Sequence, residues 1–566
     1  MLPTDDPDRV MNVARRLTVS ARAMPEAAAV VEPLGYDRRG KRQYRQVTFR
    51  QLDDQTDRIA GGLAAMGVTP GTRLALLVPP GIDFIALVFG LFKARAVAIL
   101  IDPGMGRGNL VRCLAEAQPQ GFVAIPLVQA VRMFLRYRFP QARFNVTVGR
   151  RWFWGGRTLA ELRAAPPLQS QGRSDDPAAI IFTTGSTGPP KGVLYSHANF
   201  DAQVDAIRDF YAVRPGEVDL PGFPLFGLFN CAMGVTTVIP DMDPSRPAQV
   251  DPAKIVEAIG DWQVTQAFGS PAIWNRVGRY CQDRGIRLPS VRRILSAGAP
   301  VPAEVLERMK SCIHPEGEVH TPYGATEALP VASISAAEVL GETAAATRQG
   351  EGVCVGRCFP GIRARVIRIV DGPIRSMAEA VELPPREIGE LVVRGPVVTR
   401  RYVTRGEANL AAKIPDGPDV WHRMGDAGYF DEKGRFWFCG RLAHRVLTPD
   451  GPMYPVRCEA VFNRHPKIAR SALVGVGRPG HERPVIVLEP RGGQMPSGRR
   501  QIAEFLDEVR RLGRSHPLTA AIGDFLIHPA FPVDIRHNVK IFREKLAVWA
   551  ALKLRASTRA PFSRVP

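Results

Sequence analysis

The sequence predicts an α/β protein with a large N-terminal domain and a small α+β C-terminal domain. Segments with helical and strand periodicity alternate in residues 47–165 and again in 177–330, which is typical of parallel sheets with crossover helices. Strand-like segments dominate from about residue 361, and a short unit of strands and a helix follows a polar turn after Arg441. A chain of 566 residues is also too long for one hydrophobic core.

The two alternating regions predict two parallel-type α/β subdomains. Helical spacing is present at 51–66, 84–92, 199–211 and 272–284. Strand-like apolar runs are present at 73–78, 96–101, 178–182, 264–269 and 293–296. The alternation implies that successive strands are joined through helices.

The remaining regions predict a β-barrel-like subdomain or distorted sheet that closes the large domain, followed by the small domain. Strands are expected at 364–369, 390–394 and 436–438 for the former, and strands at 472–476 and 485–488 with a helix at 499–512 for the latter. We place the large N-terminal domain at 1–440, a hinge at 441–445 and a small C-terminal lid domain at 446–566.

The chain is strongly basic, with a formal net charge of +20 at neutral pH, and only 11 of its 75 basic residues are Lys. A compositional bias spread over the surface explains this charge, and so does an anionic partner such as nucleic acid or a membrane. The arginines are dispersed and form no motif with groove-binding geometry, so we expect no nucleic acid partner.

Cysteine usage and the apolar segments indicate a reduced, cytoplasmic protein. The eight Cys residues contain no Cys-x2-Cys pair, which argues against a disulfide framework or a zinc site. The first nine residues are polar and acidic, which argues against a signal peptide. The longest apolar stretch, 84–92, is interrupted by Lys93 and Arg95 and is too short to span a bilayer.

Residues 128–157 differ in composition from the rest of the chain. No acidic residue occurs between Glu116 and Glu161, and arginines alternate with aromatic residues at 131–139 and 150–154. This composition suits peripheral contact with a membrane or an acidic partner. It also suits an ordinary surface helix and a crossover strand, and both interpretations stay open.

A loop rich in Thr, Ser and Gly follows the apolar strand at 178–182. Residues 183–192 read Thr-Thr-Gly-Ser-Thr-Gly-Pro-Pro-Lys-Gly. Hydroxyls and backbone N–H groups suit phosphate oxygens, and glycines let the backbone approach them closely. Lys191 adds a point charge for a terminal phosphate. The loop does not fit the Walker pattern Gly-x4-Gly-Lys-Ser/Thr, and alone it is compatible with a nucleotide site or a plain turn.

Three further motifs follow in order. They are Tyr-Gly-Ala-Thr-Glu at 323–327, Met-Gly-Asp at 424–426 with Gly-Arg at 440–441, and Asn-Val-Lys-Ile at 538–541. With the loop at 183–192, their order and spacing resemble the adenylate-forming superfamily of acyl-CoA synthetases, luciferases and nonribosomal adenylation domains. The resemblance extends from about residue 47 to about residue 546. It implies activation of a carboxylate as an acyl-adenylate, with ATP and Mg²⁺ as cofactors.

The resemblance implies a role for each matching residue. The loop would hold the β- and γ-phosphates of ATP, Thr326 would contact the α-phosphate, and Glu327 would bind the metal. Lys540, on the mobile small domain, would bridge the α-phosphate and the substrate carboxylate. The implied catalytic residues are Thr326, Glu327 and Lys540. The implied ATP- and AMP-binding residues are Thr183, Thr184, Gly185, Ser186, Thr187, Gly188, Lys191, Gly298, Ala299, Pro300, Tyr323, Gly324, Ala325, Thr326, Asp426 and Arg441.

Within that set, Asp426 and Arg441 would hold the ribose and Tyr323 would lie against adenine. Each also has a simpler explanation. Glu327 fits a carboxylate at the start of a helix, and Tyr323 fits a core tyrosine. Asp426 fits a turn residue, and Lys540 fits a surface lysine.

The hinge departs from the pattern of CoA-forming members, which usually read Gly-Arg-x-x-Asp-x-Ile-Lys. His444 stands in place of the acid and Leu447 in place of the lysine, which argues against CoA transfer. His444 is a candidate base by its pKa range, and hinge geometry explains it equally well. In the substrate-side motif, Gly227 replaces a frequent His and would leave room beside an acyl group; Phe226, Phe229 and Phe268 are the other expected acyl-pocket residues.

With these departures and the run Val-Cys-Val-Gly-Arg-Cys-Phe-Pro-Gly at 353–361, the chain is most similar to the β-lactone synthetases of bacterial long-chain olefin biosynthesis. This resemblance implies a long-chain 2-alkyl-3-hydroxy acid as substrate, whose own 3-hydroxyl attacks the activated carbonyl. It also implies two partner enzymes, a hydrolase-like lactone decarboxylase and a short-chain dehydrogenase. The alternatives are a long-chain acyl-CoA or acyl-carrier-protein ligase, a degenerate adenylate binder and a basic nucleic-acid-binding protein.

Overall fold

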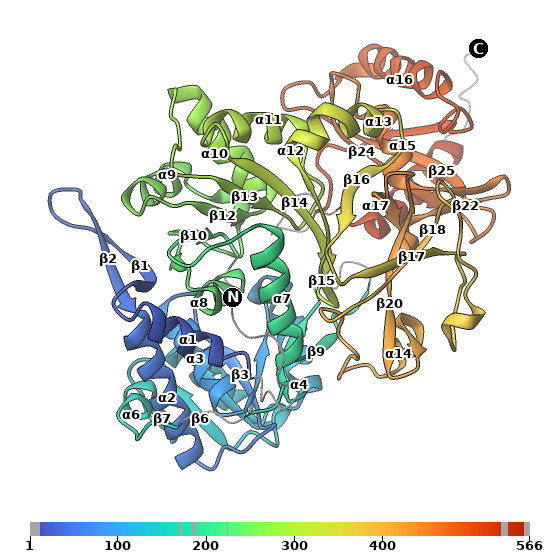
Figure 1. The fold of residues 1–566 in the computed structure, drawn as a ribbon. Helices are drawn as coiled ribbons and strands as arrows, with labels where there is room; N and C mark the ends of the chain where they lie inside the picture. The colour runs from blue at the N-terminus through green and yellow to red at the C-terminus, as the bar shows by residue number, and fades with distance from the viewer. Residues whose placement is uncertain (1–11, 169–171, 184–187, 224, 534–540, 560–566) are drawn as a thin grey trace, which may run out of the picture.

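The computed structural model describes residues 12–168, 172–183, 188–223, 225–533 and 541–559. Figure 1 shows the N-terminal two thirds of the chain around two sheets, and the C-terminal part in red at the upper right. The predicted class is confirmed, because a large α/β part precedes a small part with its own sheet and helices. Within the described ranges, no helix combines the length and apolar character that crossing a membrane requires.

The first α/β subdomain is a seven-stranded sheet in the order β7-β6-β5-β3-β4-β8-β9. All neighbours are parallel except β8 and β9. Its strands are β3 (Arg73–Leu77), β4 (Val97–Leu100), β5 (Gly121–Ala124), β6 (Phe144–Thr147), β7 (Arg157–Thr158), β8 (Pro177–Phe182) and β9 (Gly192–Ser196). Its helices are α2 (Phe49–Ala65), α3 (Ile82–Lys93), α4 (Arg107–Ala117), α5 (Pro126–Phe134) and α6 (Leu159–Arg163).

The second α/β subdomain is a parallel sheet in the order β1-β11-β10-β12-β13-β14. Its strands are β1 (Ala28–Tyr36), β10 (Val218–Pro221), β11 (Thr236–Val238), β12 (Gln266–Gly269), β13 (Arg293–Ser296) and β14 (Glu318–Ala325). Its helices are α1 (Arg15–Ala23), α7 (His197–Phe210), α8 (Phe226–Met233), α9 (Pro252–Asp261), α10 (Pro271–Arg284) and α11 (Ala303–Cys312). The antiparallel strand β2 (Arg42–Thr48) completes the edge beside β1, a hairpin that the sequence reading did not include.

The strand-rich region continues this second sheet as antiparallel strands. The order runs β14-β15-β16-β21-β20-β18-β17, with β19 paired to β20, so the region is a distorted extension of the sheet. Its strands are β15 (Ala328–Ser335), β16 (Val353–Cys358), β17 (Arg363–Ile367), β18 (Gly389–Arg394), β19 (Lys413–Asp416), β20 (Asp419–Phe430) and β21 (Phe436–Arg441). The short helices α12 (Ala336–Glu338), α13 (Ala344–Arg348) and α14 (Glu407–Ala412) connect them.

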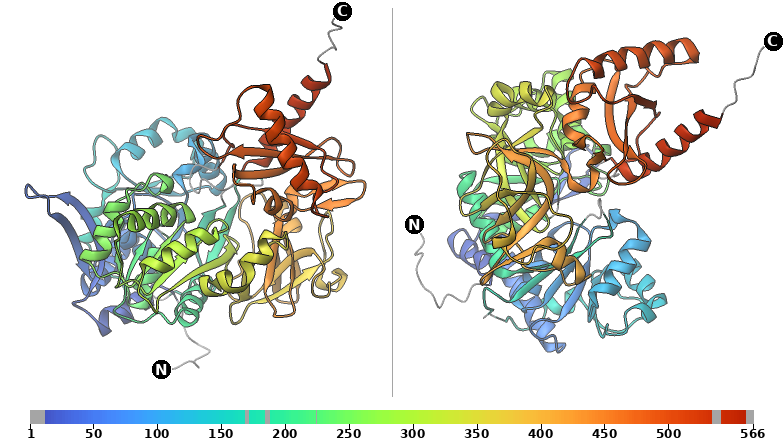
Figure 2. Two further views of the ribbon diagram at one scale, coloured as in Figure 1. Left: turned by 90° about the horizontal axis from the view of Figure 1, so that it is seen from above. Right: turned by 90° about the vertical axis from the view of Figure 1, so that its right-hand side faces the viewer.

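Residues from Val446 onward build a separate core. Phe462, Leu473, Ile486 and Phe505 are buried together there, so this C-terminal part has its own hydrophobic core. Its elements are β22 (Val446–Thr448), β23 (Gly451–Met453), α15 (Pro455–Phe462), β24 (Ile468–Val476), β25 (Arg483–Pro490), α16 (Gly498–Arg514), β26 (Asp524–Ile527) and α17 (Arg543–Arg559). The two further views in Figure 2 show α16 and α17 on this small part, away from the first sheet. The boundaries at 440 and 446 stay predictions.

Candidate active site

The turn between β14 and β15 carries Thr326 and Glu327. Ala325 pairs with Ala328 across this hairpin, so both residues project from a tight turn at the ends of two strands. The hydroxyl of Tyr195, in β9, donates a hydrogen bond to the Thr326 carbonyl. The turn is thereby tied to the first sheet, and the explanation of Glu327 as a helix-start carboxylate is wrong.

The segment after β18 fixes the orientation of Glu327. The N–H of Thr399 donates to the Glu327 carbonyl over 2.9 Å, and the Tyr402 hydroxyl donates to Glu327 Oε1 over 2.6 Å. Burial and the neighbouring carboxylate raise the pKa of Tyr402, so its phenol stays protonated at neutral pH. Glu327 therefore accepts a hydrogen bond from a neutral, buried group.

Two long-range contacts bring this segment to the site. Tyr402 forms an isolated antiparallel bridge with Val193 of β9. The Asn199 side chain, in the first turn of α7, donates to the Pro396 carbonyl over 2.9 Å. Asn199 also completes the capping box that starts α7 directly after β9. One short stretch, β9 and the start of α7, therefore positions the residues that hold Glu327.

The predicted phosphate loop is closed at its base by Lys191. The Thr183 N–H donates to the Lys191 carbonyl, and the Lys191 N–H donates to Thr183 Oγ1, each over 3.0 Å. The Lys191 ammonium lies 4.9 Å from the centre of the Tyr402 ring, a cation–π distance. Gly188 has φ of +151°, which a side chain would strain. Thr184, Gly185, Ser186 and Thr187 lie outside the described residues.

The sequence reading missed a second lysine at this site. Lys413, the first residue of β19, is buried and donates from Nζ to the carbonyl and the hydroxyl oxygen of Thr399. Its Nζ also lies 5.8 Å from the Tyr402 ring centre. Burial lowers the pKa of Lys413 to about 7, Glu327 opposes that shift and Lys191 adds to it. The only local signal in the sequence is a Lys between the apolar residues Ala412 and Ile414, in a segment where no element was predicted.

Asp426, Tyr323 and Arg441 form a second cluster. Asp426 and Arg441 are register partners on β20 and β21, and the guanidinium NH1 lies 3.1 Å from Asp426 Oδ1. The Tyr323 hydroxyl donates to the other carboxylate oxygen of Asp426. Burial and Asp426 raise the pKa of Tyr323, whereas Asp426 raises the pKa of Arg441. The structure thus brings the predicted adenine and ribose residues into direct contact.

The small-residue segment after β13 lies at the same sheet edge as the Tyr323 motif. Gly298, Ala299 and Pro300 follow the strand, and Gly298 has φ of +95°, in the left-handed region. The strands β13 and β14 are parallel, so their carboxyl ends share one edge. This edge therefore also carries Gly324 and Ala325, near the end of β14.

The predicted acyl-pocket residues form an aromatic cluster on α8 and β12. The Phe226 and Phe268 rings stack with centroids 3.7 Å apart, and the Phe226 and Phe229 centroids are 6.2 Å apart. A Cβ at Gly227 would lie 3.2 Å from Thr237 Cγ2, so glycine allows α8 to approach β11. That packing gives Gly227 a structural role, and its place beside an acyl chain stays a prediction.

Lys540 lies outside the described residues, but both ends of its segment are fixed. Val533 and Ile541 form an antiparallel bridge, and Arg543 donates to both carboxylate oxygens of Glu459, each over 2.7 Å. His444 Nε2 lies 3.1 Å from Glu544 Oε1, which joins the hinge to α17. This contact explains His444 as part of the hinge. Burial lowers its pKa.

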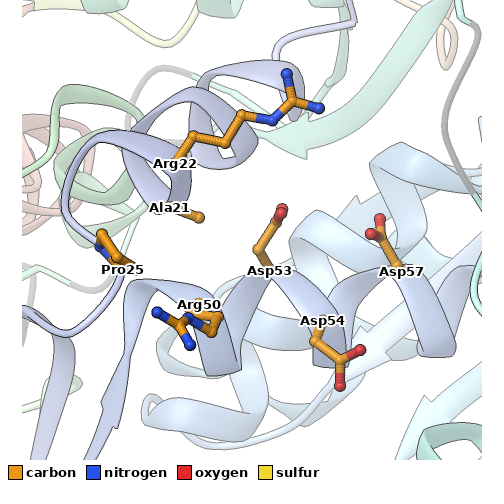
Figure 3. Close-up of a pocket in the computed structure, with 7 residues that line it drawn as sticks. All are labelled: Ala21, Arg22, Pro25, Arg50, Asp53, Asp54 and Asp57. Carbon is orange, nitrogen blue, oxygen red and sulfur yellow. The ribbon is translucent and has the colours of Figure 1, made fainter.

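An open depression of about 400 Å³ lies elsewhere, between α1 and α2 (Figure 3). Asp53, Asp54 and Asp57 line it with Arg22 and Arg50. The buried Lys93 ammonium lies 2.6 Å from a carboxylate oxygen of Asp53 and of Asp57. These ion pairs explain two of the acidic residues as structural, and none of the predicted site residues lines the depression. Across the described ranges, no cluster of His, Cys, Asp and Glu could hold a metal by itself.

Comparison with known proteins identifies the family. A family model described as AMP-binding enzyme matches residues 17–403. The olefin beta-lactone synthetase of Xanthomonas campestris pv. campestris is 46% identical over 550 residues, 95% of this chain and 97% of that protein. The enzyme of the same name from Stenotrophomonas maltophilia is 45% identical over 97% of this chain and 99% of that protein.

The fold also matches solved structures. The amide bond synthetase McbA from Marinactinospora thermotolerans superposes with a TM-score of 0.76 over 96% of this chain and 100% of its own, at 23% identity. The predicted resemblance to adenylate-forming enzymes and to β-lactone synthetases is confirmed. The chain therefore belongs to the AMP-binding enzyme family, together with the olefin β-lactone synthetases to which it is similar over nearly its whole length.

Proposed function

We propose that this protein uses ATP to activate a long-chain 2-alkyl-3-hydroxy fatty acid and closes it to a β-lactone, with release of AMP and pyrophosphate. The observation that carries the proposal is the 46% identity to an olefin beta-lactone synthetase over 95% of the chain. Membership of the AMP-binding family agrees with ATP as the co-substrate. The roles of individual residues in the two steps belong to the same proposal.

In the first step, a carboxylate oxygen of the acid attacks the α-phosphorus of ATP and the bond to pyrophosphate breaks. Two anions must approach each other, so cations and N–H donors around the phosphates lower the barrier. Lys191 and the loop at 183–192 bind the β- and γ-phosphates. Lys540 enters with the small domain and offsets the charge of the α-phosphate and the carboxylate. Asp426 accepts hydrogen bonds from the ribose hydroxyls, beside Arg441.

Glu327 fits a ligand for Mg²⁺. Its carboxylate sits at a hairpin turn and accepts a hydrogen bond from neutral Tyr402. No Lys or Arg of the described chain lies within ion-pair distance of it, so the carboxylate stays available to a hard cation. When bound, Mg²⁺ would offset the charge of the triphosphate. Thr326, next to it in the turn, contacts the α-phosphate.

In the second step, the 3-hydroxyl oxygen attacks the carbonyl carbon of the same molecule. The bond from that carbon to the AMP oxygen breaks, and the hydroxyl proton passes to a base. The tethered nucleophile has a high effective concentration, so no second substrate enters. Phe226, Phe229 and Phe268 border the acyl chain and limit access of water to the adenylate.

One incubation distinguishes this function from the second candidate, a long-chain acyl-CoA or acyl-carrier-protein ligase. The full-length protein is incubated with ATP, Mg²⁺ and a synthetic 2-alkyl-3-hydroxy acid, with and without CoA, and the products are identified by mass. We expect β-lactone and AMP to form at the same rate with and without CoA, and the free thiol of CoA not to be consumed. A thioester formed at the expense of the lactone would establish the ligase.

The reaction also suggests neighbours in a pathway. Its substrate carries a secondary alcohol, which a short-chain dehydrogenase would form from a ketone. Its product is a strained lactone, which a hydrolase-like decarboxylase would convert to an alkene and CO₂. We propose these two enzymes as partners, and contact of residues 128–157 with a membrane. Affinity purification of the tagged protein from cells that express all three enzymes tests the first proposal, because recovery of neither enzyme would contradict it.

A further inference from the structure

Helix α5 presents its apolar side to solvent. Leu127, Val131 and Phe134 are spaced at i, i+4 and i+7, lie on one side of the helix and are 65%, 51% and 81% exposed. The polar Gln129 is instead fully buried, and its side chain donates to the Val146 carbonyl over 2.9 Å. This arrangement is the reverse of a helix that covers a core, where the apolar side faces inward.

Two adjoining segments extend this surface. Tyr137 follows α5 in a 3₁₀ turn and is 68% exposed, whereas Trp152 and Phe153 follow β6 and are 53% and 71% exposed. The ring of Trp154 packs against those of Trp152 and Phe153, with centroid distances of 5.3 Å and 5.2 Å. Its indole N–H donates a hydrogen bond to Thr147 Oγ1. We call the six exposed residues the outer apolar face: Leu127, Val131, Phe134, Tyr137, Trp152 and Phe153.

The sheet brings the two parts of this face together. The strands β5 and β6 are parallel neighbours, so α5 and the loop after β6 leave the same edge. A Cβ on Gly149, in that loop, would lie 3.8 Å from the ring of Pro126 at the start of α5. The loop at 183–191 leaves the same edge three strands away, after β8, which is about 14 Å at ordinary strand spacing.

Arginines border the outer apolar face, and one of them, Arg151, has its Nη1 atom 3.9 Å from Glu161 Oε2. Arg136 and Arg138 flank Tyr137, Arg150 and Arg151 precede Trp152, and no acidic residue occurs between Glu116 and Glu161. Arg132 differs from these, because its Nε donates to Gln129 and its guanidinium lies 5.7 Å from the Phe122 ring. It packs against the protein and is a poor site for a charge reversal.

We propose that the outer apolar face and its arginines bind the surface of a lipid bilayer that contains anionic lipids. Aromatic and aliphatic side chains enter the interface, and the arginines contact anionic headgroups. The formal net charge of +20 adds a long-range attraction to the same surface. The proposal concerns binding alone, so it holds or fails independently of the lactone chemistry.

The test uses the full-length protein and flotation with vesicles. One set contains phosphatidylcholine with about half phosphatidylglycerol, and the other contains phosphatidylcholine alone. We expect binding to the anionic set that weakens at high salt, and little binding to the neutral set. The double variant Phe134→Ser/Phe153→Ser should bind anionic vesicles about tenfold or more weakly than the wild type. The double variant Arg136→Glu/Arg138→Glu should show a loss of the same size.

Matched changes elsewhere on the surface provide the controls. Leu410 on α14 is 68% exposed, so Leu410→Ser removes a comparable apolar group. Arg38→Glu with Arg39→Glu, between β1 and β2, changes the net charge as much as the paired reversal. Unchanged thermal unfolding and ATP–pyrophosphate exchange verify that each variant folds. The proposal is overturned by absence of binding, by equal losses in the controls, or by a dimer in solution that Phe134→Ser dissociates.

Discussion

The hydroxyl of Tyr402 donates a hydrogen bond to the Glu327 carboxylate over 2.6 Å. The same tyrosine lies 4.9 Å beneath the Lys191 ammonium and 5.8 Å from that of Lys413. One buried aromatic side chain therefore contacts the proposed metal ligand and both cations near it. This relationship connects the hairpin turn of the second sheet with the base of the phosphate loop in the first.

Tyr402→Phe should impair adenylation through Glu327. The ring and its contacts with the lysines remain, but the carboxylate loses the hydroxyl that orients it. A hydrogen bond to a charged group contributes about 1.5–3 kcal/mol, so we expect acyl-AMP formation to fall by about tenfold to a hundredfold. The Mg²⁺ concentration for half-maximal ATP–pyrophosphate exchange should also rise.

Tyr429→Phe is the matched control for that variant. Tyr429 is buried and donates to Glu351 Oε2 over 2.8 Å, so this variant also removes a hydrogen bond from a tyrosine to a glutamate, but one that does not involve Glu327. It should lower stability without altering the Mg²⁺ dependence. If Tyr429→Phe alters that dependence as much as Tyr402→Phe does, the effect is a general one on folding and the assignment of Glu327 loses its support.

Lys413→Met should make stability depend less on pH. Burial lowers the pKa of Lys413 from 10.5 to about 7, and unfolding restores the higher value. Between these values the unfolded chain binds one more proton, so the native protein gains stability as pH rises. The variant lacks that gain. Its melting temperature relative to wild type should therefore be highest near about pH 6.5 and fall by about pH 9.5.

Lys93→Met provides the contrast, because Lys93 is equally buried but pairs with Asp53 and Asp57 at 2.6 Å each. Its loss leaves two carboxylates without their cation and should cost about 3–5 kcal/mol of unfolding free energy. Urea unfolding of both variants at several pH values gives the comparison. A destabilisation of Lys413→Met equal to that of Lys93→Met would show that Lys413 is paired like Lys93.

Local sequence patterns predicted most of the fold. The strand expected at 293–296 is β13, with the same bounds, and the helix expected at 84–92 lies within α3. Periodicity succeeds there because burial decides which residues are apolar within each element. The β1–β2 hairpin was not predicted, because polar residues at its exposed positions interrupt the apolar periodicity of both strands.

The candidate site was predictable only where short motifs occur. Thr326, Glu327, Asp426 and Arg441 belong to such motifs, and the structure places the first two in the turn after β14 and pairs the last two across β20 and β21. Lys413 is the first residue of β19, and Tyr402 and Thr399 lie in the segment between β18 and β19. Its position depends on a bridge to Val193, about two hundred residues earlier in the chain. The periodicity of nearby residues does not predict the pairing of Tyr402 with Val193.

His197 should make the protein sensitive to acid. It is fully buried at the start of α7, and neither ring nitrogen has a hydrogen-bond partner among the described residues. Burial lowers its pKa from 6.5 to about 4, so the native state resists protonation. As pH falls from 6.5 to 4, the unfolded chain takes up the proton and stability declines, by up to about 3 kcal/mol.

The variant His197→Leu removes the group that binds this proton. The unfolding free energy, measured with urea, should therefore decline less between about pH 6.5 and pH 4.5 than in the wild type. His481→Leu changes an exposed histidine and should leave the slope as in wild type. Equal slopes for wild type and His197→Leu would show that His197 takes up its proton as readily in the native state as in the unfolded chain.

Lys540→Ala should separate catalysis from binding. The proposal places its ammonium between the α-phosphate and the incoming carboxylate, where negative charge concentrates as the new bond forms. Interactions made mainly in the transition state lower the rate when removed but change ground-state binding little. We expect acyl-AMP formation to fall by about a hundredfold or more, measured by ATP–pyrophosphate exchange, whereas calorimetric ATP affinity changes by less than about threefold. Lys545→Ala is the control, since Lys545 lies on α17 with its ammonium 4.7 Å from the Phe542 ring and should affect neither quantity. Parallel losses of rate and affinity in Lys540→Ala, or no loss of either, would remove the lysine from the reaction and with it the role of the small domain in adenylation.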